Sequence, residues 1–540
     1  MKPEDKKRSY EIGRRRTFAI ISHPDAGKTT LTEKLLLYGG AIRLAGSVKS
    51  RRAQKHAVSD WMEIEKQRGI SVTSSVLQFE YEDHVVNILD TPGHQDFSED
   101  TYRTLMAADN AVMVIDCAKG VEAQTKKLFQ VCKMRNIPIF TFINKMDRAG
   151  KDPFELMEEI EKILDIEAYP MNWPVGTDGN FKGVYNRVKS QMEIFEGGHH
   201  GQAKTSALTG NIDDHIFQDL LGEHLHHQLM DEIELLDEAG NQFDHKRILK
   251  GELTPVFFGS AMTNFGVQPF LESFLELTLP PASRSSNDED INPEKDEFTS
   301  FIFKIQANMN PAHRDRIAFM RICSGKFTKG MVAYLSRNHK KVKLAQPQQF
   351  FAQDRSVVEE AWAGDIIGVH DPGIFQIGDT LTEKDLSIEY DGIPVFAPEH
   401  FARVAPVDTM KRKQFIKGIQ QLSEEGAIQI FKPLNTGIEE IFVGVVGALQ
   451  FEVLQYRLTN EYNVDIKMTQ LPYRHVRWIE ADQFDADRFS LTMDSILGVD
   501  DFGSPVILFQ NEWTVEKVED RNKGVALHSI STRKDNKAPL

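Results

Sequence analysis

Short apolar runs alternate with helical segments through the first half of the chain, in residues 1–283. Several runs have the length and composition of buried strands: Phe18–Ser22, Val85–Asp90, Ala111–Asp116, Ile137–Asn144 and Thr254–Ser260. The alternation predicts a parallel sheet with helices on both faces. Each run ends in a polar residue, and ligands of open α/β sheets bind beyond the carboxyl ends of the strands. The pattern therefore predicts that these strand ends converge on one site.

One interval of this half is too long for a single strand–helix repeat, namely the stretch between Asp147 and Ser260. We expect an insertion at about residues 179–251, made of solvated polar helices. Its histidines are His199, His200, His224, His226 and His227. No cysteine accompanies them and the nearby acidic residues lack ligand spacing, so the sequence favours a solvated surface over a metal site.

The pattern changes in the second half of the chain. Residues 280–297 are polar and rich in Pro, Ser, Asp and Asn, which predicts a domain linker at residues 284–297. Residues 298–390 consist of short alternating segments punctuated by glycine, which is typical of a closed β-barrel. In residues 391–540 strands alternate with helices, expected at Arg412–Gly426 and Leu449–Asn460, which predicts a ferredoxin-like α/β sandwich.

A phosphate-binding loop follows the first predicted strand. It comprises Ser22, His23, Pro24, Asp25, Ala26, Gly27, Lys28, Thr29 and Thr30. A strand, a tight loop and a helix N-terminus direct N–H groups and the positive end of the helix dipole at an anion. Gly27 lets the backbone approach closely, Lys28 can reach the β- and γ-phosphates, and the Thr29 hydroxyl can bind Mg²⁺. Ser22 stands where the usual pattern prefers Gly, so this loop alone does not decide the ligand.

Three further strand ends carry groups that suit a guanine nucleotide. They are Asp90-Thr91-Pro92-Gly93-His94, Asn144-Lys145-Met146-Asp147 and Gly259-Ser260-Ala261. Asp90 can hold Mg²⁺ through water, and the Gly93 amide can meet the γ-phosphate, as in P-loop hydrolases. The Asp147 carboxylate can accept from guanine N1–H and the 2-amino group, a pair that adenine does not offer. The N–H groups of Ser260 and Ala261 can meet guanine O6. The motifs together predict binding of GTP and GDP.

A second hydroxyl ligand for Mg²⁺ is expected from the segment before Asp90, ordered only when a γ-phosphate is present. Ser71, directly after Arg-Gly-Ile, is the first candidate, and Thr73 is the second. Taken without the other motifs, both hydroxyls are more typical of the start of a strand, and this interpretation stays open.

Composition narrows the class of protein further. The 540 residues suffice for roughly three or four domains. A net charge of −16 argues against non-specific nucleic-acid binding by the whole surface, although a basic run such as Lys340-Lys341 with Lys343 can dock on RNA. The three cysteines show no metal spacing, and no apolar run approaches the ~20 residues of a membrane span. We expect a cytoplasmic protein with no membrane association.

The motifs resemble those of the bacterial class II peptide-chain release factors, a family of translational GTPases in the elongation factor G-like superfamily. Ser22–Thr30, Ser59–Thr73 and Asp90–Arg103 carry the resemblance, which extends over essentially the whole chain. It implies a ribosome-dependent GTPase of translation termination that promotes dissociation of codon-reading (class I) release factors after peptide release. By the same resemblance, His94 orients the attacking water with help from ribosomal RNA. Ser71 takes the place of the superfamily's usual Thr at Mg²⁺.

The resemblance also implies the partners, which are the ribosome and, directly or through it, class I release factors. We expect the chain to be a monomer. An alternative is an elongation-type GTPase that moves tRNA. Such factors carry further C-terminal domains, whereas this sequence leaves room for one α/β domain after the barrel. A non-hydrolysing guanine-nucleotide-binding scaffold would lack a water-positioning residue, and His94 is present.

Overall fold

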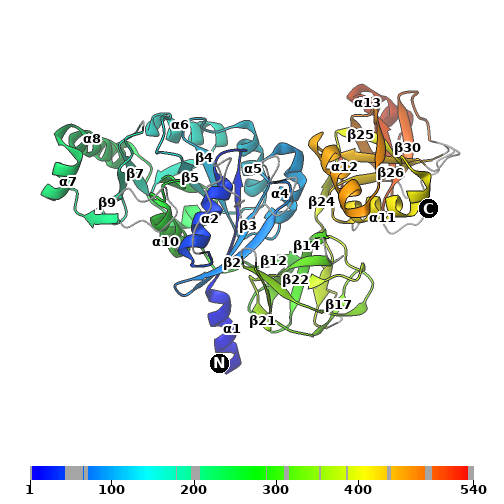
Figure 1. The fold of residues 1–540 in the computed structure, drawn as a ribbon, viewed down its shortest axis with the longest axis horizontal. Coiled ribbons are helices and arrows are strands. Elements are labelled where there is room, and N and C mark those ends of the chain that lie inside the picture. The colour runs from blue at the N-terminus through cyan, green and yellow to red at the C-terminus, as the bar shows by residue number, and fades with distance from the viewer. Residues whose placement is uncertain are drawn as a thin grey trace.

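A computed structural model describes residues 3–42, 65, 71–177, 179–195, 207–286, 289–308, 315–351, 354–384, 387–434, 440–480 and 489–532. The expectations for His199 and His200, and for residues 59–70 apart from Glu65, lie outside the described residues. Figure 1 shows an α/β part formed by the N-terminal half, a β part below it, and a second α/β part at the right formed by the C-terminal residues.

A seven-stranded sheet forms the centre of the N-terminal part, with strand order β2-β3-β1-β4-β5-β11-β6. Its strands are β1 (Arg15–Ser22), β2 (Ser75–Tyr81), β3 (His84–Asp90), β4 (Asn110–Asp116), β5 (Ile139–Asn144), β6 (Glu167–Pro170) and β11 (Leu253–Phe258). All the predicted strands are present, and β1 pairs in parallel with both β3 and β4. The sheet differs from the predicted parallel arrangement at one edge, where β2 pairs antiparallel with β3. Only two residues connect these strands, and so short a loop joins antiparallel neighbours.

Helices cover both faces of this sheet, as predicted. They are α2 (Lys28–Tyr38), α4 (Ser98–Leu105), α5 (Ala123–Met134), α6 (Pro153–Leu164) and α10 (Val267–Leu277), while α1 (Pro3–Gly13) projects towards the β part (Figure 1). On one face α2 and α10 share a core with the strands, in which the rings of Phe18 and Phe274 lie 4.6 Å apart. On the other face α4, α5 and α6 contribute Leu105, Phe129 and Ile160 to a second core. The sheet is therefore buried on both sides, and its carboxyl edge is left for a ligand.

The insertion contains more strands than the sequence predicted. A four-stranded antiparallel sheet comes first, formed by β7 (Asn172–Val175), β8 (Gly183–Asn186), β9 (Gln191–Phe195) and β10 (Ala207–Gly210). Helices α7 (His215–Leu221), α8 (Glu223–Ala239) and α9 (His245–Leu249) follow. Strands of four or five residues are too short to show a clear alternation, so only the helical half matched the expectation. His226 is buried with Nε2 3.0 Å from the Ile212 carbonyl, and the described residues hold no cluster suited to a metal.

The β part is a curled antiparallel sheet of eight strands in the order β18-β17-β23-β14-β15-β22-β19-β20. These strands are β14 (Thr299–Ala307), β15 (Arg316–Ser324), β17 (Val332–Leu335), β18 (Lys340–Lys343), β19 (Gln348–Phe351), β20 (Asp354–Val357), β22 (Ile366–His370) and β23 (Thr380–Thr382). A small sheet pairs β16 (Lys326–Thr328) with β21 (Glu360–Trp362). The stretch expected to be a linker contains a hairpin of β12 (Arg284–Ser286) and β13 (Glu289–Ile291).

The C-terminal part contains the predicted ferredoxin-like unit and a second half that the sequence pattern did not show. Its strands are β25 (His400–Pro406), β26 (Gln429–Pro433), β27 (Ile441–Val445), β28 (Ile466–Leu471), β29 (His475–Glu480), β30 (Ser495–Asp500), β31 (Pro505–Phe509) and β32 (Ala526–His528), with β24 (Pro394–Phe396) paired to β33 (Ile530–Thr532). The helices are α11 (Arg412–Glu424), α12 (Leu449–Tyr462) and α13 (Glu512–Arg521), preceded by the 3-10 turn Thr409–Lys411. The order β28-β25-β27-β26 with α11 and α12 forms the ferredoxin-like sandwich, which β30, β31, β29 and β32 extend.

The N-terminal and β parts are joined by a buried ion pair. Arg15 Nε lies 2.8 Å from Asp365 Oδ2, and both side chains are almost fully buried. The Thr17 hydroxyl donates to the Gly364 carbonyl at 2.7 Å, and Gln78 Nε2 donates to Asp365 Oδ1 at 3.2 Å. These bonds fix how the two parts dock, because loss of either partner would leave the other one charged and buried.

Candidate functional site

A cavity of about 440 Å³ lies at the carboxyl edge of the central sheet. Loops that follow β1, β3, β4 and β5 form it, together with Ser71, which precedes β2, and Met262, which follows β11. The lining residues are Ser22, His23, Pro24, Asp25, Gly27, Lys28, Thr29, Thr30, Ser71, Gly93, His94, Lys119, Asn144, Lys145, Asp147, Arg148 and Met262. The parallel strands thus bring motifs that are distant in sequence to one place, as expected for an open α/β sheet.

The loop between β1 and α2 is shaped to surround an anion. Gly27 has a φ of +95°, and a Cβ there would lie 2.3 Å from Nδ2 of Asn144. Position 27 therefore offers neither the backbone conformation nor the space for a side chain. Helix α2 begins at Lys28, and no side chain caps its N-terminus. Its first N–H groups and the positive end of its dipole are available to an anion in the cavity.

Lys28 of the phosphate-binding loop and Asp90 form a buried ion pair. Lys28 Nζ lies 2.6 Å from Asp90 Oδ1, and the two side chains are 6% and 2% exposed. The other carboxylate oxygen, Asp90 Oδ2, is buried and has no hydrogen-bond partner among the described residues. A buried oxygen without a partner is costly, so this position fits a water molecule or a hydrated cation.

The Asn144 side chain connects three loops of the site. Its Oδ1 accepts hydrogen bonds from the N–H groups of Lys145, at 2.8 Å, and Ala261, at 2.9 Å. Its Nδ2 donates to the Ala26 carbonyl at 2.9 Å. Asn144 is buried, so these bonds are shielded from water. One amide therefore positions the phosphate-binding loop relative to the segments after β5 and β11.

Lys145 links the phosphate-binding loop to the end of β4. Its Nζ donates to Asp116 Oδ2 at 2.6 Å and also to the Asp25 carbonyl. Burial alone would raise the pKa of Asp116, but hydrogen bonds from Lys145 and from the Ala118 N–H hold this pKa below its usual value. The Asp116 carboxylate is therefore ionised at neutral pH and keeps the Lys145 chain extended along the cavity.

At the end of the cavity predicted to hold the guanine base, the hydrogen bonds differ in one respect from the sequence expectation. The Ser260 hydroxyl donates to Asp147 Oδ1 at 2.6 Å, which orients the predicted base-reading carboxylate. The N–H groups of Ser260 and Ala261, expected at guanine O6, donate within the protein to Phe265 O and Asn144 Oδ1, both at 2.9 Å. The three-residue motif does not reveal these bonds, because Phe265 lies beyond it and Asn144 is distant in sequence. In this structure Ser260 contributes through its hydroxyl.

His94 lies in the loop after β3, beside the phosphate end of the cavity. Its side chain is 29% exposed, and it caps the 3-10 helix η1 (Gln95–Phe97). His94 Nδ1 lies 3.2 Å from both the N–H and Oδ1 of Asp96. Behind the loop, the Thr91 hydroxyl donates to the Ile20 carbonyl at 2.7 Å, which ties the end of β3 to β1. One ring nitrogen of His94 thus faces Asp96 while the ring borders the cavity.

The two candidate hydroxyl ligands lie in different places. Ser71 lines the same cavity as Thr29. Thr73 lines a second cavity, at the junction with the C-terminal part. Its N–H donates to Glu65 Oε1 at 3.2 Å, so the chain has already turned away from the nucleotide end. This arrangement favours Ser71 over Thr73.

Some predicted site residues stand behind the cavity rather than in its wall: Ala26, Asp90, Thr91, Pro92, Met146, Ser260 and Ala261. Met146, for example, is buried and donates its N–H to the Gly259 carbonyl at 3.2 Å. Conversely, Lys119, Arg148 and Met262 line the cavity without having been predicted. Lys119 follows the end of β4, so the strand-end argument that identified the other loops could have found it.

The fold and the site define a P-loop GTPase domain followed by a β and an α/β domain. Comparison with family models agrees. Residues 13–280 match the Elongation factor Tu GTP binding domain, residues 297–384 match Elongation factor G domain 2, and residues 390–519 match Class II release factor RF3, C-terminal domain. The chain is a translational GTPase that binds guanine nucleotides.

Curated relatives narrow the class to a family. Peptide chain release factor 3 of Symbiobacterium thermophilum is 61% identical over 521 residues, which cover 96% of this chain and 98% of the relative. The proteins of the same name from Listeria monocytogenes and Trichodesmium erythraeum are 54% and 52% identical, each over 96% of this chain and over 98% and 96% of their own lengths. The chain belongs to the peptide chain release factor 3 family, translational GTPases of termination.

A solved structure from Thermus thermophilus shares the fold. It superimposes with a TM-score of 0.68 at 20% identity, covering 90% of this chain and 72% of that one.

The role of Asp147 can be tested by exchanging an acceptor for a donor. Asp147→Asn should weaken GTP binding by roughly 30- to 1,000-fold, the equivalent of roughly 2–4 kcal/mol for a charge-assisted pair of hydrogen bonds. Xanthine nucleotides, whose 2-oxo group needs a donor, should bind better. Titration of both nucleotides measures this. Asp165→Asn is the matched control, because Asp165 is exposed and its left-handed backbone suits Asn. Unchanged GTP affinity in Asp147→Asn would show that Asp147 does not contact the base.

Proposed function

We propose that this chain is a ribosome-stimulated GTPase that speeds departure of a class I release factor after the peptide has been freed. The observation that carries the proposal is the single cavity that gathers the phosphate loop, His94 and Asp147. The C-terminal match over residues 390–519 to a class II release factor domain supports a role in termination. The chemistry is GTP and water to GDP and phosphate.

The cavity contains groups for each part of phosphoryl transfer. Lys28 and the N-terminus of α2 would neutralise charge on the β- and γ-phosphates. His94 would orient the attacking water. Arg148 is the one arginine among the described residues that line the cavity. Its Nε lies 3.9 Å from Oδ2 of Asp147, at the end predicted to hold the guanine base. We propose slow turnover of this chain by itself, with activation by a large partner.

Mg²⁺ is part of the proposal, and the residues fit it. The hydroxyls of Thr29 and Ser71 border the same cavity, and Asp90 Oδ2 has no partner among the described residues. Mg²⁺ prefers oxygen ligands and keeps several waters, which suits two hydroxyls and a carboxylate that acts through water. When bound, the ion would supply charge neutralisation at the β- and γ-phosphates. Loss of the γ-phosphate would release the Ser71 segment and the Gly93 loop.

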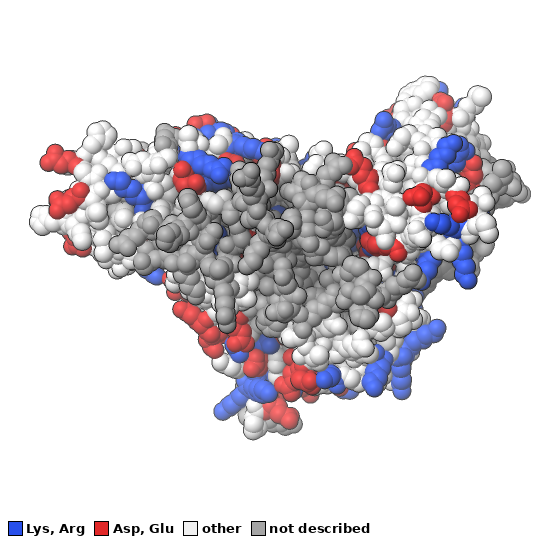
Figure 2. Space-filling model, in the orientation of Figure 1, with Lys and Arg blue, Asp and Glu red and all other residues white. Residues whose placement is uncertain are grey.

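The partners that we propose are the ribosome and, directly or through it, class I release factors. On the face shown in Figure 2, basic side chains gather at the outer edge of the β part, whereas the insertion end carries mainly acidic ones. In β18, Lys340 and Lys341 are exposed, which gives RNA phosphates a local docking point on an acidic protein. Among the helices that the structure describes, none is long and apolar enough to cross a membrane. We propose a monomer that acts in the cytoplasm.

An elongation-type GTPase that translocates tRNA is the alternative. Both kinds of factor share the first two domains, since residues 297–384 match an elongation factor G domain. The release-factor match of the C-terminal domain and the high identity to release factors favour termination.

The two candidate hydroxyls offer a matched pair of variants for the metal site. Ser71→Ala should raise the Mg²⁺ concentration needed for half-maximal binding of a GTP analogue by about 5-fold, because a lost polar contact is worth about 1 kcal/mol. GDP binding should change little. Thr73→Ala, which alters the junction cavity instead, should leave the Mg²⁺ dependence unchanged. The reverse pattern would make Thr73 the ligand.

The proposed function is tested by labelling a class I release factor and following its dissociation from ribosomes whose peptide has been released. With GTP, this chain should speed dissociation. His94→Ala should bind GTP normally, while ribosome-stimulated hydrolysis should fall by about 10²-fold. The elongation-type alternative is correct if the chain and GTP do not speed dissociation of the class I release factor but do speed tRNA movement.

A further inference from the structure

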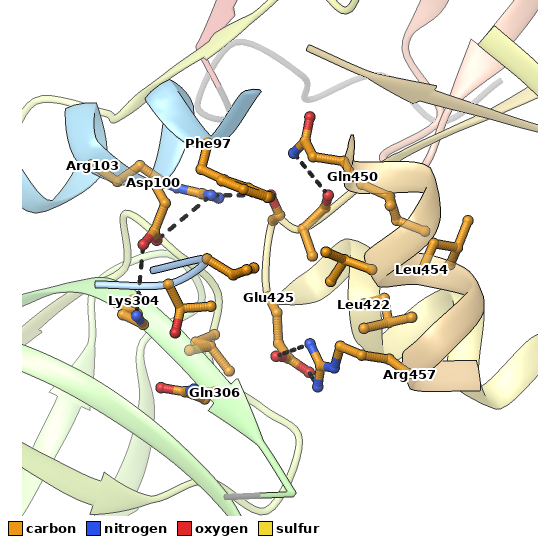
Figure 3. A pocket seen from close by; sticks show the side chains of 17 residues that line it. Phe97, Asp100, Arg103, Lys304, Gln306, Leu422, Glu425, Gln450, Leu454 and Arg457 are labelled. Atoms are coloured by element: carbon orange, nitrogen blue, oxygen red, sulfur yellow. Dashed lines mark hydrogen bonds and ion pairs between the residues drawn. The ribbon is translucent and has the colours of Figure 1, made fainter. Parts of the chain in front are cut away.

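The loop that carries His94 also contacts the C-terminal domain. Figure 3 shows the junction cavity there, with Phe97 and Arg103 from the N-terminal domain, Lys304 from the β domain and Glu425 from the C-terminal domain around it. Arg103 Nη2 donates to the Gly426 carbonyl at 3.0 Å. The nucleotide site and the C-terminal domain are thus separated by one short segment, η1.

Asp96, in η1, touches both sides of this segment. Its side chain is 10% exposed, and its Oδ1 lies 3.2 Å from Nδ1 of His94. Its Oδ2 accepts a hydrogen bond of 2.8 Å from the N–H of Leu449, the first residue of α12. One carboxylate therefore contacts the proposed water-orienting residue and a helix of another domain.

The contact with α12 is close and electrostatically favourable. No side chain of Ala448 caps α12, so Asp96 supplies the acceptor and the negative charge that a helix N-terminus favours. A Cβ at Gly447 would lie 2.1 Å from Cγ of Asp96, so the backbone of the C-terminal domain lies directly against this carboxylate. The Asp96 carboxylate is therefore held against the N-terminus of α12.

The carboxylate in turn affects the ring of His94. Two groups of Asp96 face Nδ1, its N–H and its Oδ1, each at 3.2 Å. The two hydrogen bonds cannot form at the same time. The Asp96 N–H can donate only to an unprotonated Nδ1, whereas Oδ1 can accept only from an Nδ1–H. When Nδ1–H donates to the carboxylate, a neutral ring has a lone pair on Nε2 that can accept from water. When Nδ1 accepts from the N–H, Nε2 carries the proton and cannot accept.

We propose that Asp96 is a positioning residue through which the C-terminal domain sets the tautomer and orientation of His94. With α12 docked, the Leu449 N–H holds the carboxylate beside Nδ1, and Nε2 is the acceptor. When α12 moves away, the carboxylate loses this restraint and the backbone N–H can take its place. The proposal rests on the function proposed above, in which His94 orients the attacking water.

Steady-state GTP hydrolysis by the full chain at saturating GTP, with and without ribosomes, tests this role. Asp96→Asn keeps an oxygen for Leu449 but removes the charge beside His94, so kcat should fall by about 10-fold. The affinity for GTP and the ribosome concentration at half-maximal rate should not change. Gly447→Ala substitutes no residue of the nucleotide site, but its Cβ would lie 2.1 Å from Cγ and 2.5 Å from Cα of Asp96, so it displaces Asp96 and should lower kcat by several-fold. Gly13→Ala is the matched control, since nothing lies within 4 Å of its Cβ.

A structural role is distinguished by repeating both substitutions in a His94→Ala background. If Asp96 acts through His94, neither should reduce the rate further, whereas a purely structural effect would add. An additional loss in that background, or unchanged kcat in Asp96→Asn, would overturn the inference. If Gly447→Ala does not fold, the Asp96→Asn and His94→Ala pair still decides the question. Absence of ribosome stimulation in the unmodified chain would overturn the proposed function instead, and the intrinsic rates of the variants would still decide the role of Asp96.

Discussion

The organisation of the nucleotide site depends on one buried amide. Asn144 accepts from two backbone N–H groups and donates to the Ala26 carbonyl, so it holds the loops after β1, β5 and β11 in register. None of these loops has a core of its own, and each takes its place from the strand that it follows. Gly27 must lie close to Asn144 for this to occur, which explains why a side chain there would collide with the amide. The sheet therefore brings the loops of the site together, and the hydrogen bonds of Asn144 hold them in place.

From this site the contacts continue into the C-terminal domain. Val72 and Phe97, from the two segments that border the phosphate end, pack against Val453 of α12 in one apolar cluster. Some buried polar atoms around the junction have no hydrogen-bond partner among the described residues: Arg103 Nη1, Gln306 Nε2 and Thr73 Oγ1. Unpaired buried groups cost free energy, so this junction is suited to opening and closing, unlike a fully paired core. An interface of this kind can convert loss of a phosphate into movement of a domain.

Much of the site could be predicted from the sequence, because parallel strands place their polar ends together. Lys28, His94 and Asp147 were found in this way, and all three line one cavity. Strand ends do not reveal a group that is engaged by a partner distant in sequence. The Ala261 N–H is taken by Asn144, and no local pattern could show this. The contact between Asp96 and Leu449 joins residues 353 positions apart, so only the folded chain reveals it.

The fold was predictable where elements are long and periodic. The central strands and the helices α11 and α12 lie close to their expected positions. The insertion strands β7–β10 were missed, because segments of four or five residues carry little periodic signal. The edge strand β2 follows its two-residue turn rather than the parallel rule, and a tight turn outweighs the general pattern of the sheet.

Coupling of the nucleotide site to the C-terminal domain through this junction can be measured as a distance between the two domains. Spin labels at Lys127→Cys on α5 and Gln455→Cys on α12 would report on it, since both positions are exposed and the native cysteines Cys117, Cys132 and Cys323 are buried. The most direct measurement is the distance distribution between the two labels, with GDP in solution and with a GTP analogue on ribosomes. We expect a single short distance with the GTP analogue on ribosomes, where α12 is docked on Asp96, and a clear shift with GDP, after the γ-phosphate is lost. Identical distributions in the two states would contradict it.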